Sequence, residues 1–249
     1  MIGTVFLVGA GPGDPKLLTV RAHELVSRCE VLAHDELVSE SILAIAPRRA
    51  ERIRVGRRGR GVRHHDARIH PLVIARAKEG RDVVRLKGGD PMIFGRGGEE
   101  IEELRAAGVP FEVVPGITAA LGAAASLGFP LTHRDAAHAV TLRTAHRART
   151  TGSSEGSSDT LVFYMGLAEL ESVTATLIGE GHTPTTPALV VSNATRKTQR
   201  HVLATLATIA VRSRSARLET PALLFVGAAV ASAALPAGAS RSLRLLRVG

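Results

Sequence analysis

Short apolar runs alternate with amphipathic stretches along the first half of the chain. The runs at residues 4–8, 83–87 and 111–114 predict buried strands, because each is short and ends in glycine or proline-containing turns. A further short strand begins at Val31 and ends near Asp35. Helices are expected at residues 20–28 (with Thr19 as the N-cap), 71–79, 98–107 and 117–127. Such an alternation is typical of a mainly parallel α/β sheet.

The second half repeats this alternation after a polar stretch rich in glycine and serine. That stretch, residues 147–159, contains no apolar residue beyond Ala148, and its composition is typical of a flexible linker. We therefore expect an N-terminal α/β domain over residues 1–146, the linker over 147–159 and a C-terminal α/β domain over 160–249. The expected elements are strands at 160–164, 188–191 and 222–226 and helices at 167–178 and 203–211.

A glycine-rich segment follows the apolar run that ends at Lys87. It contains Gly88, Gly89, Gly95, Gly97 and Gly98, with Asp90 and Pro91 among them. A tight turn explains two glycines but not five in eleven residues. Glycine lets a backbone approach a ligand closely, and ligands of open α/β sheets bind where the strands end. This loop is therefore a candidate small-molecule site.

A second glycine-rich loop, residues 9–15, follows the first predicted strand. It is similar to a dinucleotide-binding fingerprint, but Asp14 occupies the position of the last glycine. Pro12 and Pro15 delay the helix, so no helix N-terminus faces the loop where a pyrophosphate would need it. The loop suits a ligand that is contacted by backbone groups and carries no phosphate there.

Composition and charge narrow the class of partner. The formal net charge of +9 favours a polyanion, either nucleic acid or a substrate with several carboxylates or phosphates. Aromatic residues make up only 3% of the chain and the arginines are scattered, which argues against nucleic acid. A single Cys29 fits a reducing compartment, and no signal peptide or membrane-spanning run is recognisable. We expect a soluble, cytoplasmic protein without a membrane partner.

Two segments that contain histidine are candidates for a functional role. His64, His65 and His70 lie near Asp66, but Arg63 and Arg68 lie in the same stretch and oppose cation binding. We expect no metal site there, and a solvated or substrate-facing loop instead. The segment His133-Arg134-Asp135 follows a predicted helix, and it is either a structural ion pair or the border of a pocket.

Six ordered motifs resemble the tetrapyrrole methylase family over residues 4–226. They are Gly9-Ala-Gly-Pro-Gly-Asp-Pro15, Val84-Arg-Leu-Lys-Gly-Gly-Asp-Pro91, Phe94-Gly-Arg-Gly-Gly-Glu-Glu100, Val114-Pro-Gly-Ile-Thr118, Pro130-Leu-Thr-His-Arg-Asp135 and Val162-Phe-Tyr-Met-Gly166. The last two are most similar to the members that act on uroporphyrinogen III. The resemblance implies two α/β domains with S-adenosylmethionine in the cleft between them, and a homodimer.

The resemblance also implies a reaction and its residues. The reaction is methylation of uroporphyrinogen III at C2 and C7, which gives precorrin-2 by way of precorrin-1 for siroheme or cobalamin. Asp35 corresponds to a proton acceptor and Arg57 to a proton donor. The implied cofactor contacts, of which the last two match least closely, are Pro12, Gly88, Gly89, Asp90, Ile93, Thr118, Ala119, Met165, Ala194 and Ala222.

The chain departs from the family pattern on the expected substrate side. Arg57 stands where lysine is usual, and since arginine is a very poor proton donor, we assign it first to binding a substrate carboxylate. His34, Asp66 and His70 replace a usual tyrosine, glutamine and asparagine. The alternatives that stay open are methylation of a later corrinoid precursor, methylation of RNA or protein, and a non-catalytic tetrapyrrole-binding or carrier protein.

Overall fold

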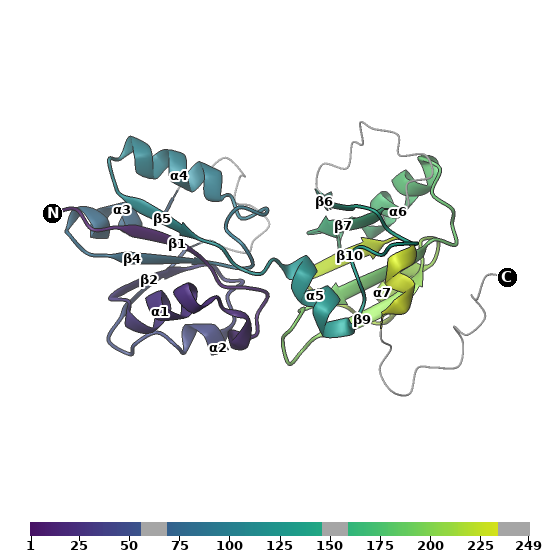
Figure 1. Ribbon diagram of the computed structural model, residues 1–249, viewed down its shortest axis with the longest axis horizontal. Coiled ribbons are helices and arrows are strands. Elements are labelled where there is room, and N and C mark those ends of the chain that lie inside the picture. Colours follow the sequence, from purple (N-terminus) through teal and green to yellow (C-terminus); the bar gives the residue numbers. More distant parts are fainter. Residues whose placement is uncertain (56–68, 146–158, 234–249) are drawn as a thin grey trace. The chain divides into compact units, whose positions relative to one another are not determined.

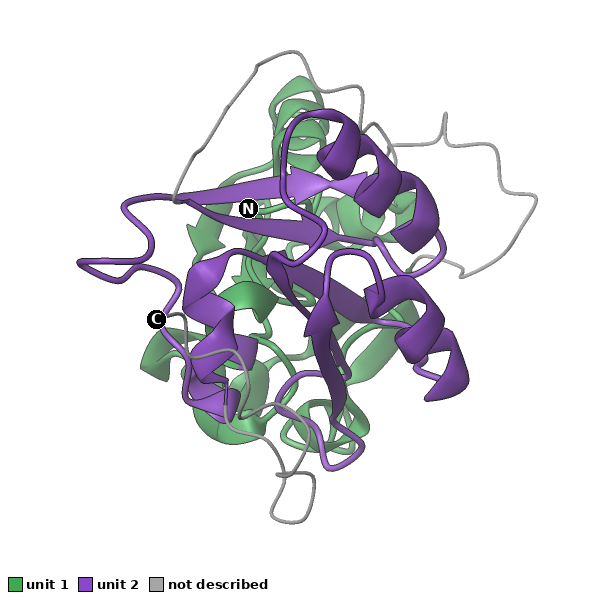
Figure 2. Ribbon diagram, turned by 90° about the vertical axis from the view of Figure 1, so that its right-hand side faces the viewer, with its two compact units in different colours: residues 1–122 green, residues 123–249 purple. Residues whose placement is uncertain are grey.

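The computed structural model describes residues 1–55, 69–145 and 159–233 of the chain. The chain divides into two compact units, residues 1–122 and 123–249, each built around its own five-stranded sheet (Figures 1 and 2). The expected two-domain α/β architecture is therefore confirmed. No helix within the described ranges combines the length and the apolar character needed to cross a membrane.

The first unit contains a wholly parallel sheet of strand order β3-β2-β4-β1-β5. Its strands are β1 (Val5–Gly9), β2 (Val31–His34), β3 (Glu51–Arg54), β4 (Val83–Lys87) and β5 (Phe111–Val114). The central strand β4 is buried along its whole length. That burial fits the aliphatic residues Val83, Val84 and Leu86, since parallel sheets are covered on both faces.

Helices cover both faces of this sheet (Figure 1). The helices α1 (Val20–Arg28) and α2 (Glu40–Leu43) pack on one face, and α3 (Pro71–Lys78) and α4 (Gly97–Ala106) pack on the other. Thr19 caps α1 as expected, because its Oγ1 accepts a hydrogen bond from Ala22 N at 3.1 Å. A short 3₁₀ helix, Pro15–Leu17, precedes α1, so the prolines do delay the helix.

The second unit contains a mixed sheet of strand order β6-β7-β10-β8-β9. Its strands are β6 (Val140–Thr144), β7 (Thr160–Tyr164), β8 (Pro187–Ser192), β9 (Arg200–Thr205) and β10 (Ala222–Val226). Among the strand pairs of residues 123–145 and 159–233, β6–β7 is parallel and the other three are antiparallel. The helices are α6 (Leu170–Gly179), α7 (Ile209–Ser215) and the 3₁₀ segment Ala228–Ser232, while α5 (Ala119–Leu127) spans the division between the units.

The predicted helix at residues 203–211 is wrong. Its first part belongs to β9, which pairs with β8 so that Val202 lies opposite Val190, and the helix α7 begins only at Ile209. The apolar residues of this stretch fit either period, and pairing with a buried neighbouring strand selects the extended form.

The division between the units falls earlier than the boundary expected from composition. Strand β6 pairs with β7 in register Val140 to Thr160, so residues 140–144 belong to the second sheet although the sequence analysis assigned them to the first domain. The physical reason is that β6 and β7 pair with each other although the polar stretch 147–159 separates them along the chain. Composition marks that stretch as a boundary but does not show which strands pair across it. Residues 147–158 of the predicted linker lie outside the described residues.

Candidate functional site

Three loops of the first unit meet where adjacent strands β4, β1 and β5 end. Ala10 N donates to Lys87 O at 2.7 Å, Gly11 N donates to Gly89 O at 3.1 Å, and Gly89 N donates to Gly11 O at 2.8 Å. The chain leaves β1 toward α1 on one face and leaves β4 toward α4 on the other. Strands whose connections diverge in this way form the crevice in which open α/β sheets bind ligands.

Glycine is required at this meeting point by contact between backbones. A Cβ on Gly9 would lie 2.5 Å from Gly116 N, and a Cβ on Gly116 would lie 2.2 Å from Gly89 O. Gly89 also has a φ of 68°, in the left-handed region that favours glycine. From the sequence we expect the glycines of the loop that begins at Gly9 to let the backbone approach a ligand. The structure shows that Gly9 and Gly116 are needed first to bring the three loops together.

Gly88 and Gly89 differ in how much room lies beside them, with Gly88 close to Leu37 and Gly89 at ordinary contact distance from the loop after β5. A Cβ on Gly89 would meet only Thr118 Cα and Ala119 N, each 3.8 Å away, and one on Gly88 would meet Leu37 Cβ at 3.3 Å. Both glycines are half-buried, and we call their backbone, bordered by Thr118 and Ala119, the cradle. Such a cradle fits a small molecule contacted by backbone groups.

Asp90 fixes the loop after β4 to the loop after β5. Its Oδ1 accepts from Met92 N at 2.8 Å, and its Oδ2 accepts from Gly116 N at 2.9 Å. Both carboxylate oxygens thus have backbone donors within the first unit. Asp90 shapes the candidate site, whatever ligand group it also contacts.

The structure brings the predicted cofactor contacts of the first unit to one edge of its sheet. Pro12 follows β1, the residues from Gly88 to Ile93 follow β4, and Thr118 and Ala119 follow β5. Because parallel strands end at the same edge, all three groups lie at the carboxyl edge of the sheet. Ile93 is 36% exposed and Thr118 is buried, with its carbonyl accepting from Leu121 N and Gly122 N.

The predicted contacts of the second unit also share an edge of their sheet. Met165 follows β7, Ala194 follows β8, and Ala222 begins β10, which lies antiparallel between those two strands. Met165 has a φ of 58°, and the two neighbours of Ala194 also have positive φ. Non-glycine residues in this conformation are uncommon and gather at functional sites. Whether these three residues bind a cofactor remains a prediction.

Asp35 lies beside the end of β4 and contacts a buried group of charges. Its backbone N donates to Leu86 O at 3.2 Å, and its Oδ1 lies 2.6 Å from Arg85 Nη2. The same Arg85 nitrogen donates to Glu100 Oε1 at 2.8 Å, and Lys87 Nζ donates to that oxygen at 2.7 Å. Burial, followed by the nearby Arg85 charge, lowers the pKa of Lys87. Asp35 is the one member of this group with a substantially exposed side chain, at 28%.

Arg85, Lys87 and Glu100 are not among the site residues predicted from the sequence. A signal was present, because two cations at alternate positions of an apolar strand point to the same face and need a buried counterion. The acidic residues at the start of α4, Glu99 and Glu100, are among the candidates. Which of them turns inward depends on the packing of α4, so the sequence alone does not identify Glu100.

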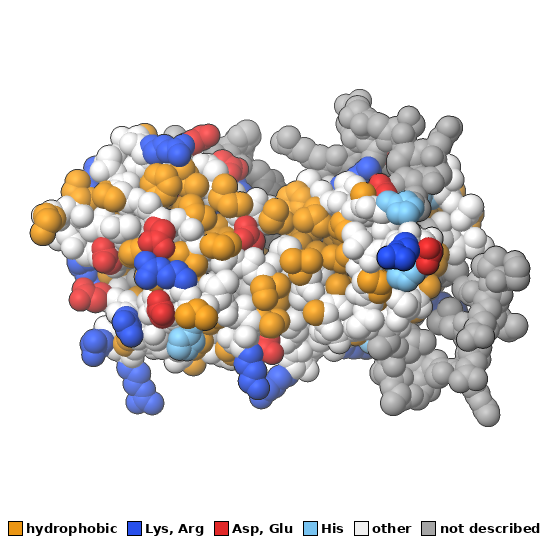
Figure 3. All heavy atoms as spheres, in the orientation of Figure 1, with side chains coloured by type: hydrophobic (Ala, Val, Ile, Leu, Met, Phe, Trp, Pro, Cys, Tyr) orange, Lys and Arg blue, Asp and Glu red, His pale blue; other side chains and the backbone are white. Residues whose placement is uncertain are grey.

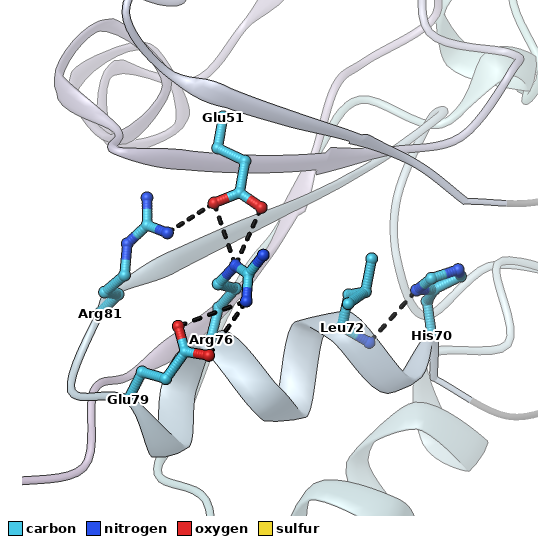
Figure 4. Close-up of polar contacts among 6 residues, drawn as sticks. All are labelled: Glu51, His70, Leu72, Arg76, Glu79 and Arg81. Atoms are coloured by element: carbon cyan, nitrogen blue, oxygen red, sulfur yellow. Dashed lines mark hydrogen bonds and ion pairs between the residues drawn. The ribbon is translucent and has the colours of Figure 1, made fainter.

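The remaining candidates do not join this edge within the described residues. Arg57, His64, His65 and Asp66 lie outside them. His70 is the N-cap of α3, where its Nδ1 accepts from Leu72 N at 3.3 Å (Figure 4). The backbone of His133 closes a tight turn with Ala137. Among residues 1–55, 69–145 and 159–233, no three His, Cys, Asp or Glu side chains are grouped so that they could hold a metal ion.

The chain belongs to the tetrapyrrole (corrin/porphyrin) methylase family, whose profile it matches over residues 4–210. It is 50% identical over 236 residues to siroheme synthase 2 of Halorhodospira halophila, covering 92% of this chain but 47% of that protein. The chain thus spans about half the length of that relative.

Solved structures agree with the family assignment. Uroporphyrin-III-C-methyltransferase from Thermus thermophilus is 40% identical, with a TM-score of 0.78 and coverage of 92% of this chain and 96% of that one. A second structure of the Thermus enzyme, in complex with S-adenyl homocysteine, has a TM-score of 0.73, with coverage of 92% and 93%. A cobalt precorrin-4 methyltransferase has the same TM-score of 0.78 but only 27% identity, with coverage of 91% and 95%.

Proposed function

We propose that this chain is an S-adenosylmethionine-dependent methyltransferase that methylates uroporphyrinogen III at C2 and C7, giving precorrin-2 by way of precorrin-1. The observation that carries the proposal is the backbone cradle at Gly88 and Gly89, bordered by Thr118 and Ala119 at the ends of three adjacent strands. The likeness to a uroporphyrin-III-C-methyltransferase, at 40% identity, supports the choice of substrate over a later corrinoid, for which the identity is 27%.

The described residues fit S-adenosylmethionine as the methyl donor. When bound, this cofactor supplies a methyl group on a sulfonium, which is already a strong electrophile. The chain then has mainly to bind, orient and exclude water. Gly88, Gly89 and Ala119 would approach the cofactor through their backbone, while Asp90 keeps the loops in place. Pro12, Ile93 and Thr118 complete the proposed contacts in the first unit, and Met165, Ala194 and Ala222 are those proposed in the second.

Asp35 is proposed to accept the proton released as the methylated pyrrole ring rearranges. Its carboxylate is partly exposed and lies at the same sheet edge as the Gly88–Gly89 cradle, since its N–H bonds to Leu86 O. A carboxylate held at the reacting ring can act as a general base. Arg57 is proposed to bind a substrate carboxylate through its planar guanidinium rather than to donate a proton.

The positive charge of the chain suits a substrate with many carboxylates. Uroporphyrinogen III carries acetate and propionate side chains, and the net charge of +9 would attract them. On the face drawn in Figure 3, the Lys and Arg side chains of the described residues are scattered and form no continuous stripe of the kind expected along a nucleic-acid backbone. This distribution favours a small polyanion.

We also propose that the protein is a cytoplasmic homodimer and that its product feeds siroheme or cobalamin synthesis. These proposals follow from the family resemblance and the single Cys29. Light scattering across micromolar concentrations tests the dimer, and a monomer throughout would contradict it.

The proposed activity is tested by incubating the purified chain with uroporphyrinogen III and S-adenosylmethionine under anaerobic conditions. Mass spectrometry of the tetrapyrrole should show one and then two added methyl groups. A parallel incubation with a later corrinoid precursor is the matched control. Methylation of the later corrinoid precursor but not of uroporphyrinogen III would show that the corrinoid precursor is the substrate. Tetrapyrrole binding without any methylation would favour the carrier alternative.

A further inference from the structure

The strand β4 carries two charged side chains into the interior of the first unit. Residues 83, 85 and 87 alternate along the strand and face the same side, and Val83 belongs to the core that α3 and α4 cover. Arg85 and Lys87 are therefore buried under α4, where each side chain is at most 6% exposed. Buried cations are costly unless they are paired, so their partners must be found nearby.

Glu100 of α4 is the partner of both cations. Its Oε1 accepts from Arg85 Nη2 at 2.8 Å and from Lys87 Nζ at 2.7 Å. One carboxylate cannot balance two buried cations, and the second negative charge is Asp35, whose Oδ1 lies 2.6 Å from the same Arg85 nitrogen. The four side chains together are neutral when Asp35 is ionised. Arg85 is the member that connects the buried pair to Asp35.

We propose that Arg85 is the positioning residue for Asp35, and that Glu100 and Lys87 in turn hold Arg85. The guanidinium is fixed on one side by Glu100 and by Leu86 O, which accepts from Nη1 at 3.2 Å. It fixes one oxygen of Asp35 on the other side and leaves the second to accept a proton from the substrate. A buried, doubly anchored cation restrains a base more closely than an exposed one, because its own side chain has no freedom to move.

Two buried polar atoms fit this role. Arg85 Nε and Glu100 Oε2 have no hydrogen-bond partner among the described residues. A buried group of charges is often no more stable than apolar residues in its place, so stability alone does not account for this one.

The inference rests on the proposed function and is tested by a double-mutant cycle between Arg85 and Asp35. Arg85→Met keeps an unbranched side chain and leaves Lys87 and Glu100 as a neutral pair, so the unit should still fold. We expect kcat for methyl transfer to fall by about tenfold or more, with KM for uroporphyrinogen III and the Kd for S-adenosylmethionine within about twofold. The double variant, Arg85→Met with Asp35→Asn, should have nearly the same kcat as Asp35→Asn alone, because Arg85 affects the reaction only through Asp35.

The matched control is Arg21→Met, which removes an arginine of the same unit from an exposed pair with Glu112 (Nη2–Oε2 3.1 Å). Its kcat should stay within about twofold of the unmodified chain. Unchanged kcat in Arg85→Met, or losses that multiply in the double variant, would overturn the assignment. If Arg85→Met does not fold, Arg85→Lys takes its place in the cycle. A lysine at position 85 keeps the positive charge, but its single ammonium cannot contact Glu100 and Asp35 as the guanidinium does. We therefore expect the same coupling between positions 85 and 35.

A crystal structure of the Arg85 variant supplies a readout that does not depend on activity. We expect the Asp35 carboxylate to leave its position beside residue 85, while the Gly88–Gly89 loop is unchanged. A carboxylate that keeps its position would contradict the inference. Absence of methylated product from the unmodified chain would instead refute the proposed function, so the two failures are distinguishable.

Discussion

Gly116 N donates a hydrogen bond to Asp90 Oδ2 at 2.9 Å, joining the loops that follow β4 and β5 across the end of β1. Gly9, the last residue of β1, lies against Gly116, and the absence of a Cβ on Gly9 leaves room for it. The candidate site is thus assembled from three strand ends by one carboxylate and by contact between glycine backbones.

Asp90→Ala should weaken cofactor binding and also destabilise the first unit. The substitution leaves the N–H groups of Met92 and Gly116 without their charged acceptor, which costs about 2 kcal/mol of unfolding free energy. We expect the affinity for S-adenosylmethionine to fall by about tenfold or more, because the cradle loses its shape. Calorimetric titration and urea unfolding measure the two effects. A folded variant with unchanged affinity would remove this loop from the cofactor site.

Gly116→Ala and Gly98→Ala should have opposite effects on stability. A Cβ at Gly116 would overlap Gly89 O, which is backbone and cannot move aside cheaply, so we expect a loss of several kcal/mol, on the order of other overpacked sites. A Cβ at Gly98 meets nothing within 4 Å, and alanine favours the helix by about 0.5–1 kcal/mol. Thermal unfolding of both variants tests this prediction. Equal changes in Tm would contradict the close backbone contact between Gly116 and Gly89.

Glu51 should contribute to stability in a pH-dependent way. Hydrogen bonds from Arg81 and then from Arg76 hold its pKa below the usual value of 4.5 (Figure 4). Since the unfolded chain then binds a proton more readily than the folded one, the stabilisation is present above about pH 4.5 and is lost as the pH falls below it.

The matched comparison for this effect is Glu51→Gln. The difference in unfolding free energy between the unmodified chain and the variant should be largest near pH 7 and should shrink toward pH 3. The whole effect should be modest, about 1 kcal/mol or less, because the side chains are about one third exposed. Urea unfolding at several pH values measures this difference. If the difference in unfolding free energy grew as the pH fell, Glu51 would not have a lowered pKa in the folded chain.

Asp35→Asn and Arg57→Lys should separate proton transfer from substrate binding. Loss of the carboxylate should lower kcat strongly while the affinity for S-adenosylmethionine stays nearly constant. Arg57→Lys should raise KM for uroporphyrinogen III more than it lowers kcat, since a planar guanidinium is lost and the charge remains. Steady-state kinetics distinguishes these cases. Faster turnover in Arg57→Lys with a new pH limb would instead assign proton donation to this position.

Local sequence patterns predicted most of the first unit. The apolar run of β4, the Thr19 cap and the strand–loop–helix order were recognisable because period, capping and turn chemistry depend on near neighbours. The strand β9 was missed because its partner β8 decides its conformation. The contacts of Asp90 and Arg85 join residues 26 and 15 positions apart, so their roles depend on the tertiary fold.

The decisive measurement transfers a carbon-13 methyl group from labelled S-adenosylmethionine to uroporphyrinogen III and locates it by NMR. We expect two labelled methyl groups, bonded to the ring carbons C2 and C7 of the product. Asp35→Asn should give much less of both under the same conditions. Label on any other atom, or a tetrapyrrole recovered without label while the cofactor is bound, would refute the proposed reaction.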